Sequence, residues 1–319
     1  MVWAMLRNYC RQGGIPMKPK TKTKSIESGG ELSAALMLSP SLFLLLTTSI
    51  YPFFWMFRYI CSDYNGFTSY FTGTYNFTRM LNDQLFWSSV AHTFEYAALK
   101  LIFIIPFSLL LAVFLSQKIK GSGFFRAVYF MPTVISSAVY SLIFGFIFAV
   151  FNGSLNAILS ILGIIDAPVD WLGNPDLVMG SIITVAVWGG LGNYMILFIS
   201  GMSGISADVY ESSKIDGANG VQTFFRITLP MLSPILKVIL LLALTSAFKD
   251  YESIMVLTNG GPNNRSQVMF GYIYQIIFGT TTSVPQIGYG TMLSVTAALI
   301  IGVVTAVYLF FARKLDDVV

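Results

Sequence analysis

Six long apolar stretches constrain this chain more than any other feature of its sequence, because each is long enough to cross a lipid bilayer. A helix needs about 20 residues to cross the hydrocarbon core. The stretches cover residues 32–57, 88–115, 124–151, 177–200, 232–257 and 287–311. Each should be an α-helix, since a backbone in lipid must satisfy its own hydrogen bonds. The sequence therefore predicts an all-α fold, a polytopic membrane bundle of six transmembrane helices.

The composition also indicates lipid surroundings rather than a large soluble core. Of the 319 residues, 55% are hydrophobic and 11% are charged, and the mean hydropathy is +0.70. A soluble domain carries about 25% charged residues. The net charge of +4 comes from clusters that flank the apolar stretches, so it indicates topology rather than a nucleic-acid partner. Two further apolar runs, at 154–165 and 268–278, are too short to span and are predicted to be interfacial or docked helices.

Basic residues are distributed unevenly between alternate loops, which predicts the orientation of the bundle. If the N-terminus is inside the cell, the inner segments receive most lysines and arginines, and residues 152–176 outside receive none. Apart from the tail lysines, the inner basic residues are Arg11, Lys118, Lys120, Arg126, Lys214, Arg226, Arg313 and Lys314. We therefore predict cytoplasmic termini, with a basic tail at residues 1–30 and a transmembrane domain at 31–319.

The sequence of the N-terminal segment is compatible with two different first residues. Met1 and Met17 are both possible first residues. Residues 1–10 contain too short an apolar run for a cleavable signal peptide, and no small-residue cleavage site follows. The two cysteines, Cys10 and Cys61, fall on opposite sides of the membrane in the predicted topology, so no disulfide between them is expected.

The inner loop between the fourth and fifth stretches has the pattern of a helix–turn–helix. Ser206 is a suitable N-cap, and Gly217 suits a left-handed stop. A turn at 218–220 and a second short helix that ends at Pro230 follow. An apolar stripe accompanies this pattern, formed by Val209, Tyr210, Ser213, Ile215, Phe224 and Phe225. Such a stripe on a cytoplasmic loop needs a partner or the membrane surface to cover it.

This loop resembles the EAA loop of ABC importer permeases, whose pattern is Glu-Ala-Ala, a glycine after three further residues and Ile-x-Leu-Pro after nine more. The positions that agree are Glu211, Gly217, Ile227, Leu229 and Pro230. Ser212 and Ser213 replace the two alanines, but both are small, so close packing is preserved. The resemblance implies that a set of residues couples this chain to an ATPase subunit: Tyr210, Glu211, Ser212, Ser213, Asp216, Gly217, Ala218, Ile227, Leu229 and Pro230.

Two further segments resemble the maltose-type, carbohydrate-transporting subset of these permeases. One is the Leu-Thr-Asn-Gly-Gly-Pro turn at 257–262, and the other is the inner loop at 120–132. The resemblance covers roughly residues 88–314 and implies a type I ABC importer permease in the bacterial inner membrane. The partners that it implies are a second homologous permease, two ATP-binding subunits, an extracytoplasmic sugar-binding protein, a carbohydrate substrate and membrane lipid.

The chain lacks the sequence features of a catalyst. No Gly-Lys dipeptide occurs, so the phosphate-binding loop of an ATPase is absent, and ATP and Mg²⁺ are expected to bind to partner subunits. His92 is the single histidine and no metal-type Cys/His spacing exists, so we expect no catalytic residue, metal or cofactor. Two other functions are weighed against the importer, an ion-coupled secondary sugar transporter and an intramembrane enzyme that acts on lipid-linked sugars.

Polar residues within two predicted spans are candidates for a substrate path, because charged groups there usually face a cavity or a partner. Aromatic faces and amide groups suit sugar rings. The candidates are Trp188, Asn193 and Tyr194 in the fourth stretch and Lys249, Asp250, Tyr251 and Glu252 in the fifth. The structural alternative is an ion pair between Lys249 and Glu252, with Trp188 and Tyr194 in an interfacial aromatic belt.

Two other groups of residues have a structural interpretation. His92, Glu95 and Lys100 in the second stretch are expected to form a satisfied structural network. Three glycines in the fourth stretch permit close helix approach or local unwinding: Gly189, Gly190 and Gly192. Neither group is assigned to transport.

Overall fold

The protein is represented by a computed structural model, which describes residues 27–117, 120–281 and 283–314. The chain divides after Met56 into two units, each considered by itself. Most of the predicted tail, with Cys10 and both candidate start residues, lies outside the described residues. Helix α2 begins at Glu27, so the last residues of the predicted tail are helical.

The first unit is helical throughout its described part. It consists of α2 (Glu27–Leu45), a π-helical turn (Leu46–Ile50) and α3 (Tyr51–Met56). A 27-residue apolar helix at Ser33–Tyr59 is long enough to cross a membrane, which confirms the first predicted helix.

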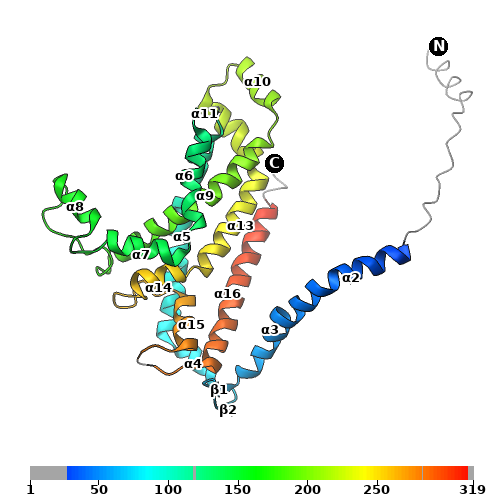
Figure 1. Cartoon of the computed structure of the whole chain (residues 1–319), viewed down its shortest axis with the longest axis vertical. Helices are drawn as coiled ribbons and strands as arrows, with labels where there is room; N and C mark the ends of the chain where they lie inside the picture. The colour runs from blue at the N-terminus through cyan, green and yellow to red at the C-terminus, as the bar shows by residue number, and fades with distance from the viewer. Residues whose placement is uncertain (1–26, 118–119, 282, 315–319) are drawn as a thin grey trace, which may run out of the picture. The chain divides into compact units, whose positions relative to one another are not determined.

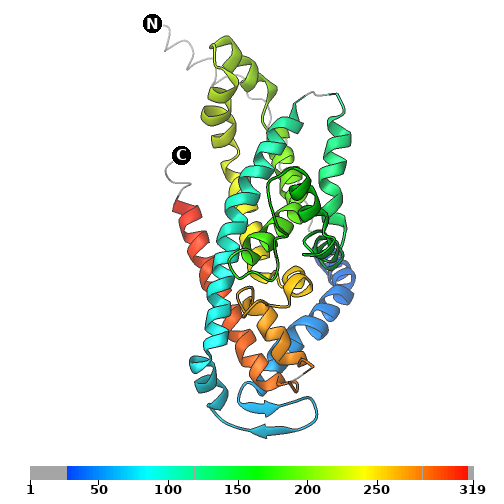
Figure 2. The same ribbon diagram turned by 90° about the vertical axis from the view of Figure 1, so that its left-hand side faces the viewer.

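Three long helices form the body of the second unit: α5 (Gln84–Ser116), α9 (Val178–Ser203) and α16 (Ile287–Lys314). Helices α5 and α9 pack along each other, and α16 lies beside α13 and α15 (Figures 1 and 2). Each of the three is long and apolar enough to cross a membrane, so three more predicted helices are confirmed.

The third predicted stretch is not one helix, which corrects the prediction. It consists of α6 (Ser122–Val134) and α7 (Ser137–Ile147), whose axes differ by 99°. Pro132 removes a backbone donor in the last turn of α6, and this loss weakens the helix at that point. Ile135 then adopts extended backbone, with φ −82° and ψ 138°, and the chain turns into α7.

The fifth predicted stretch is broken as well. Helix α13 (Ser233–Lys249) ends where span five was predicted to continue, and α14 (Glu252–Thr258) begins after a break at Asp250. At its N-terminal end α13 meets the helical segment Gly220–Met231 at 71°. Within the described residues, four helices are unbroken candidates for spans, and there are six if each bent pair counts as one.

The two short apolar runs form the short helices expected of them. These are α8 (Ser154–Ile161) and α15 (Met269–Phe278). The predicted turn at 257–262 is also present, because α14 ends at Thr258 and Asn259 adopts φ +49°. The Gly261–Pro262 peptide bond that follows is cis.

A small β-hairpin and a short helix were not predicted by the all-α assignment. Strand β1 (Ser62–Tyr64) pairs antiparallel with β2 (Ser69–Phe71), with Asp63 opposite Tyr70. The hairpin is followed by α4 (Tyr75–Asn82) and packs on the start of α16. Strands of three residues are too short for a recognisable alternation of apolar and polar side chains, which is why the sequence did not reveal them.

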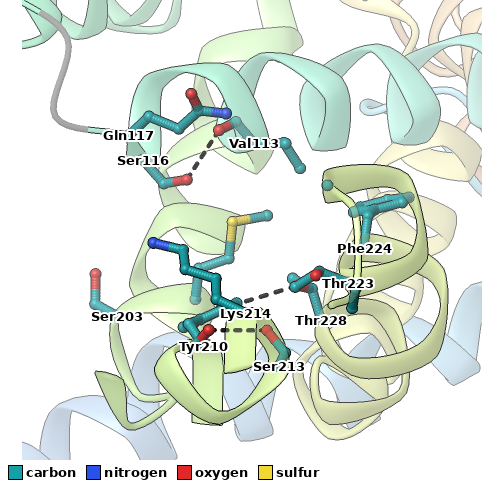
Figure 3. Close-up of a pocket in the computed structure, with 13 residues that line it drawn as sticks. Val113, Ser116, Gln117, Ser203, Tyr210, Ser213, Lys214, Thr223, Phe224 and Thr228 are labelled. Atoms are coloured by element: carbon teal, nitrogen blue, oxygen red, sulfur yellow. Dashed lines mark hydrogen bonds between the residues drawn. The ribbon is translucent and has the colours of Figure 1, made fainter. Parts of the chain in front are cut away.

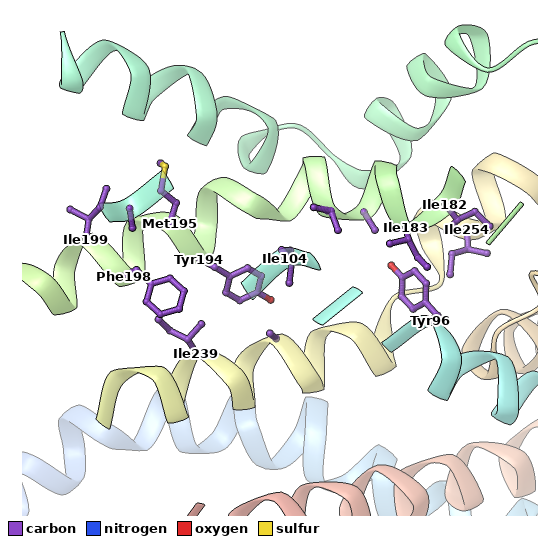
Figure 4. Packing of buried hydrophobic residues seen from close by; sticks show 14 of the residues in the cluster. Tyr96, Ile104, Ile182, Ile183, Tyr194, Met195, Phe198, Ile199, Ile239 and Ile254 are labelled. Atoms are coloured by element: carbon purple, nitrogen blue, oxygen red, sulfur yellow. The ribbon is translucent and has the colours of Figure 1, made fainter. Parts of the chain in front are cut away.

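The largest hydrophobic core lies where α5, α9 and α13 meet. Tyr194, Phe198 and Ile239 are among its buried side chains, between α9 and α13 (Figure 4). The glycines of α9 allow close packing: a Cβ on Gly192 would lie 2.7 Å from the Phe130 Cα on α6. Because α9 is continuous, the glycines serve close approach rather than unwinding, one of the two alternatives that their pattern left open.

Candidate functional site

Helix α10 (Ala207–Ile215) forms the first half of the loop at 206–230, which was predicted to be an inner loop. Ser206 Oγ accepts a hydrogen bond from the Asp208 backbone N–H at 3.4 Å, so Ser206 caps α10 as predicted. Gly217 follows with φ +77°, a conformation that strongly favours glycine, and a Cβ there would meet open space. The predicted left-handed stop is confirmed.

A second helical segment completes the loop. It runs through α11 (Gly220–Thr223), a π-helical turn (Phe224–Thr228) and α12 (Leu229–Met231). Asn219 caps α11: its Oδ1 accepts from the Gln222 N–H at 2.8 Å, and Gln222 Oε1 accepts from the Asn219 N–H at 2.9 Å. The helix–turn–helix prediction is confirmed.

The residues predicted to couple to an ATPase lie on two sides of α10. Ser213 is buried and its hydroxyl donates to the Tyr210 carbonyl at 2.8 Å. The Thr228 hydroxyl donates to the Tyr210 hydroxyl at 3.5 Å, which links α10 to the second helical segment. Glu211, Ser212 and Asp216 are exposed. Ser213 therefore packs inward, where an alanine would also fit, and the carboxylates remain accessible.

The apolar stripe of the loop is only partly covered. Phe224 and Val209 are half-buried, but Ile215 and Phe225 are 86% and 60% exposed. Ile227 and Leu229 are half-buried, and Pro230 is exposed. The prediction of an apolar surface on this loop holds for its exposed members, which the described residues leave largely uncovered.

A cavity of about 550 Å³ lies beneath the loop (Figure 3). We call it the loop cavity. Its walls come from the C-terminal ends of α5 and α9 as well as from the loop: Val113, Ser116, Gln117, Met202, Ser203, Tyr210, Ser213, Lys214, Ala218, Gly220, Thr223, Phe224 and Thr228. The loop and the ends of two long helices therefore enclose one cavity together.

A buried ion pair stabilises the break in span five. Lys100 Nζ on α5 lies 2.7 Å from Asp250 Oδ2, and the two side chains are 8% and 15% exposed. The Tyr96 hydroxyl donates to the same oxygen at 2.5 Å, and the Ser253 hydroxyl donates to Asp250 Oδ1 at 2.8 Å. Asp250 thus leaves the helical backbone of α13 to accept three side-chain donors.

The alternative pair between Lys249 and Glu252 is wrong. Both side chains are described and exposed, and the break at Asp250 separates the helices that carry them. Glu252 instead accepts a hydrogen bond from the Ser137 hydroxyl on α7. Asp250 and Glu252 therefore have different partners, on α5 and on α7.

A second cavity, of about 450 Å³, lies between the α6–α7 break and α9. We call it the central groove. Its polar lining residues are Lys100, Thr133, Ser137, Tyr140, Asn193, Tyr194 and Ser246. Two predicted path residues, Asn193 and Tyr194, are thus brought together, while Lys100, Tyr140 and Ser246 are additions that sequence reasoning did not assign to a path.

The remaining path candidates do not line this groove. The Tyr251 ring packs against the Tyr274 ring, with centroids 5.7 Å apart. Trp188 is 43% exposed and contacts the Tyr140 and Phe144 rings edge-on, at 6.1 and 5.2 Å. Both aromatics are near the groove residues in the fold, but their rings are engaged with other aromatic side chains.

Comparison with known proteins decides the family. Residues 104–317 match the family described as "Binding-protein-dependent transport system inner membrane component". The chain belongs to this family. It is therefore a multi-pass inner-membrane permease and not an enzyme, and ATP hydrolysis in such systems is performed by separate subunits.

Several relatives of the permease are named for sugar transport. The multiple sugar-binding transport system permease protein MsmF of Streptococcus mutans is 31% identical over 277 residues, covering 85% of this chain and 93% of MsmF. The trehalose/maltose transport system permease protein MalF of Thermococcus litoralis is 32% identical, covering 77% and 81%. The arabinooligosaccharides transport system permease protein AraP of Bacillus subtilis is 33% identical, covering 75% of each chain.

A solved structure has the same fold as the permease. It is the crystal structure of a bacterial ABC transporter involved in the import of the acidic polysaccharide alginate. The TM-score is 0.78 at 21% sequence identity, over 90% of this chain and 96% of that chain. The expectation of a type I importer permease fold is confirmed.

In the permease, the polar residues of span two are satisfied by separate partners rather than by one another. Glu95 forms a two-bond ion pair with Arg265, at 2.7 and 2.8 Å, and this hydrogen bonding raises the pKa of Arg265. His92 Nδ1 lies 3.3 Å from the Gln267 carbonyl. The structural interpretation is supported, but Lys100 also lines the central groove.

Sequence reasoning missed a polar cluster at the N-terminal start of α5. Asp83 caps α5 by accepting from the Leu85 and Phe86 N–H groups, and its other oxygen accepts from the Tyr272 and Tyr289 hydroxyls. Burial and the hydrogen bond to Asp83 raise the pKa of Tyr272, so it remains a neutral donor. An aspartate directly before a long apolar helix is an N-cap signal that could have revealed Asp83.

Proposed function

We propose that this chain is one of two permease subunits of an ATP-driven importer for a sugar or oligosaccharide. It forms the translocation path with a second homologous permease, receives substrate from an extracytoplasmic binding protein, and is coupled through the loop at 206–230 to two ATPase subunits. Both termini and this loop face the cytoplasm. The sugar-transport names of relatives at 31–33% identity support the substrate class.

The construction of the inner loop carries this proposal. Glu211 on α10 and Asp216 at its C-cap are exposed, and Ile215 and Phe225 are largely uncovered by the part of the chain that the structure describes. A short docking helix with an accessible carboxylate and apolar side chains suits the cleft of a partner that presents basic and apolar groups. The loop also follows α9 directly in the chain and encloses the loop cavity together with α5, so a movement of the partner would reach those helices through the loop.

The path from the loop to the substrate runs along rigid helices. Helix α9 carries Ser203 at the loop cavity and Asn193 at the central groove, and α5 carries Ser116 and Lys100 in the same two places. A displacement of the loop therefore tilts the two helices that line the groove. Such a shift biases the bundle between inward-open and outward-open states, with the ATPase supplying the differential free energy.

The central groove is our candidate for the substrate contacts of this subunit. Asn193 and Ser246 offer an amide and a hydroxyl, and Tyr140 offers an aromatic ring with a hydroxyl. This mixture of aromatic and hydrogen-bonding groups matches the apolar faces and hydroxyl edges of sugar rings. Tyr194 lines the groove and is also packed in the core, so it supports the wall.

Co-purification and energised uptake test the proposed function. The tagged chain is expressed in the cells that encode it, purified in detergent together with the proteins that associate with it, and reconstituted into vesicles. We expect an ATPase to co-purify, and uptake to require internal ATP and to resist a protonophore. If no ATPase associates and uptake follows the ion gradient instead, the secondary-transporter alternative holds and the proposed function fails.

A further inference from the structure

The charges around the central groove cancel. Lys100 is the only charged residue among the described residues that line it, and its ammonium is paired with Asp250 at 2.7 Å. Next to Asp250 in the sequence are Lys249 and Glu252, both exposed and neither among the residues that line the groove. The ion pair therefore brings no net charge to the lining of the groove.

The pair is held in place by its surroundings. Asp250 accepts from Tyr96 and Ser253 in addition to Lys100, and Lys100 also donates to the Tyr96 hydroxyl at 3.2 Å. Both Tyr96 and Lys100 are buried. Releasing Lys100 to bind an anion would leave the Asp250 carboxylate with a lost partner in a poorly hydrated site, which is strongly unfavourable.

The other groove-lining groups are neutral hydrogen-bonding partners. Ser137, Asn193 and Ser246 contribute hydroxyl and amide groups, which suit sugar hydroxyls. None of these groups compensates for the desolvation of a carboxylate that enters without its own cation. A saccharide that carries uronate groups therefore loses hydration in this groove and gains no charge partner.

From this geometry we propose that the Lys100–Asp250 pair is a specificity determinant that makes this permease select neutral saccharides and reject acidic ones. The inference rests on the proposed function and narrows its substrate class. The proposed preference for neutral saccharides differs from the substrate of the importer with the similar structure, which is the acidic polysaccharide alginate; the two chains share the fold at 21% identity.

Binding of charged probes to the purified importer tests this proposal. The complete complex in detergent, without the binding protein, is titrated calorimetrically with trigalacturonate. We expect no binding to the wild type and binding at least about tenfold tighter in Asp250→Asn, because that change leaves the Lys100 charge unpaired. Raised salt should weaken the gained binding. The double variant Lys100→Gln/Asp250→Asn, which removes both charges, is the matched control and should not gain it.

A second variant, in which the unpaired charge is negative, tests the proposal if the Asp250→Asn importer does not assemble. Lys100→Gln leaves Asp250 with its donors Tyr96 and Ser253, and it should gain binding of the cationic probe triglucosamine. The proposal is overturned if the wild type binds trigalacturonate as tightly as Asp250→Asn does. It is also overturned if an assembled single variant binds its charged probe no better than the double variant.

The two proposals fail in different ways. A wild-type importer that takes up a neutral sugar with ATP, and takes up trigalacturonate equally well, contradicts only the selectivity of the groove. An importer that contains no ATPase contradicts the proposed function before any probe is added.

Discussion

Ser137 and Glu252 join the two broken spans of this permease. Ser137 is the first residue of α7, Glu252 is the first residue of α14, and the Ser137 hydroxyl donates a hydrogen bond to the Glu252 carboxylate. Helices α7 and α14 also pack on each other. Helices α7 and α14, the second helices of the two broken spans, therefore form one layer.

The first prediction concerns this hydrogen bond. Ser137→Ala and Glu252→Gln should each lower the free energy of unfolding by about 0.5–1.5 kcal/mol, as expected for a net hydrogen bond. The loss of unfolding free energy in the double variant should be smaller than the sum of the two single losses, because both changes remove the same interaction. Thermal unfolding of the detergent-purified complex measures this coupling. Strictly additive effects would show that the contact does not join the two layers.

The second prediction concerns the packing of α9. Gly192→Ala should destabilise the protein by about 1–3 kcal/mol, because the new methyl group would overlap the α6 backbone at Tyr129 and Phe130. Gly180→Ala on the same helix is the matched control, since a Cβ there meets no atom within 4 Å. The yield of folded protein and its thermal midpoint compare the two. Equal tolerance of both changes would contradict the close approach.

The third prediction compares two ion pairs of different burial. Lys100→Ala removes the cation that pairs with Asp250, whose side chain is only 15% exposed. The free energy of unfolding should therefore fall by about 3–5 kcal/mol. Arg265→Ala breaks a pair whose side chains are 38% and 35% exposed, and solvent screening limits its loss to about 1 kcal/mol or less. Unfolding midpoints at low and high salt give both values. A larger effect at Arg265 would reverse our assignment of the buried pair as structural.

The fourth prediction concerns orientation, which rests on the distribution of lysine and arginine. Reporter fusions after Ser62, Gly153 and Pro262 should be external, and those after Gly121 and Gly217 should be internal. The enzymatic activities of a periplasmic and a cytoplasmic reporter at each site give independent signals. An external signal at Gly217 would separate the loop from any cytoplasmic ATPase.

The loop at 206–230 could be predicted closely from sequence, because its signals are local. A serine N-cap and a glycine with positive φ lie within a few residues of the helix that they delimit, and both Ser206 and Gly217 have the expected conformations. The long helices α5, α9 and α16 were predictable for a similar reason, since length and apolarity are properties of a single segment.

The central groove and the helix breaks could not be predicted, because they depend on partners far apart in the chain. Asp250 and Lys100 are separated by 150 residues, and Glu252 and Ser137 by 115. A charged residue near a span boundary suggested the pair Lys249–Glu252, which lies within one helical turn in sequence. In the structure Asp250 pairs with Lys100 on α5 instead, and helix α13 ends at Lys249.

Coupling through the inner loop is the central claim, and two of its residues separate docking from backbone geometry. Glu211→Lys reverses an exposed charge on α10, and the loss of a charge pair at an interface can cost about 2–5 kcal/mol. Gly217→Ala imposes about 1–2 kcal/mol of backbone strain at φ +77°. Gly220→Ala is the control for Gly217, because a Cβ there also meets open space and its φ is not positive.

ATP hydrolysis and sugar uptake, measured together in vesicles that contain the complete importer, test this claim most directly. Glu211→Lys should either lose the ATPase subunits on purification or hydrolyse ATP with little uptake, Gly217→Ala should show a weaker form of the same defect, and Gly220→Ala should match the wild type. If Glu211→Lys retains the ATPase at normal stoichiometry and imports sugar at the wild-type rate per ATP, the loop is only a connector and the account is contradicted.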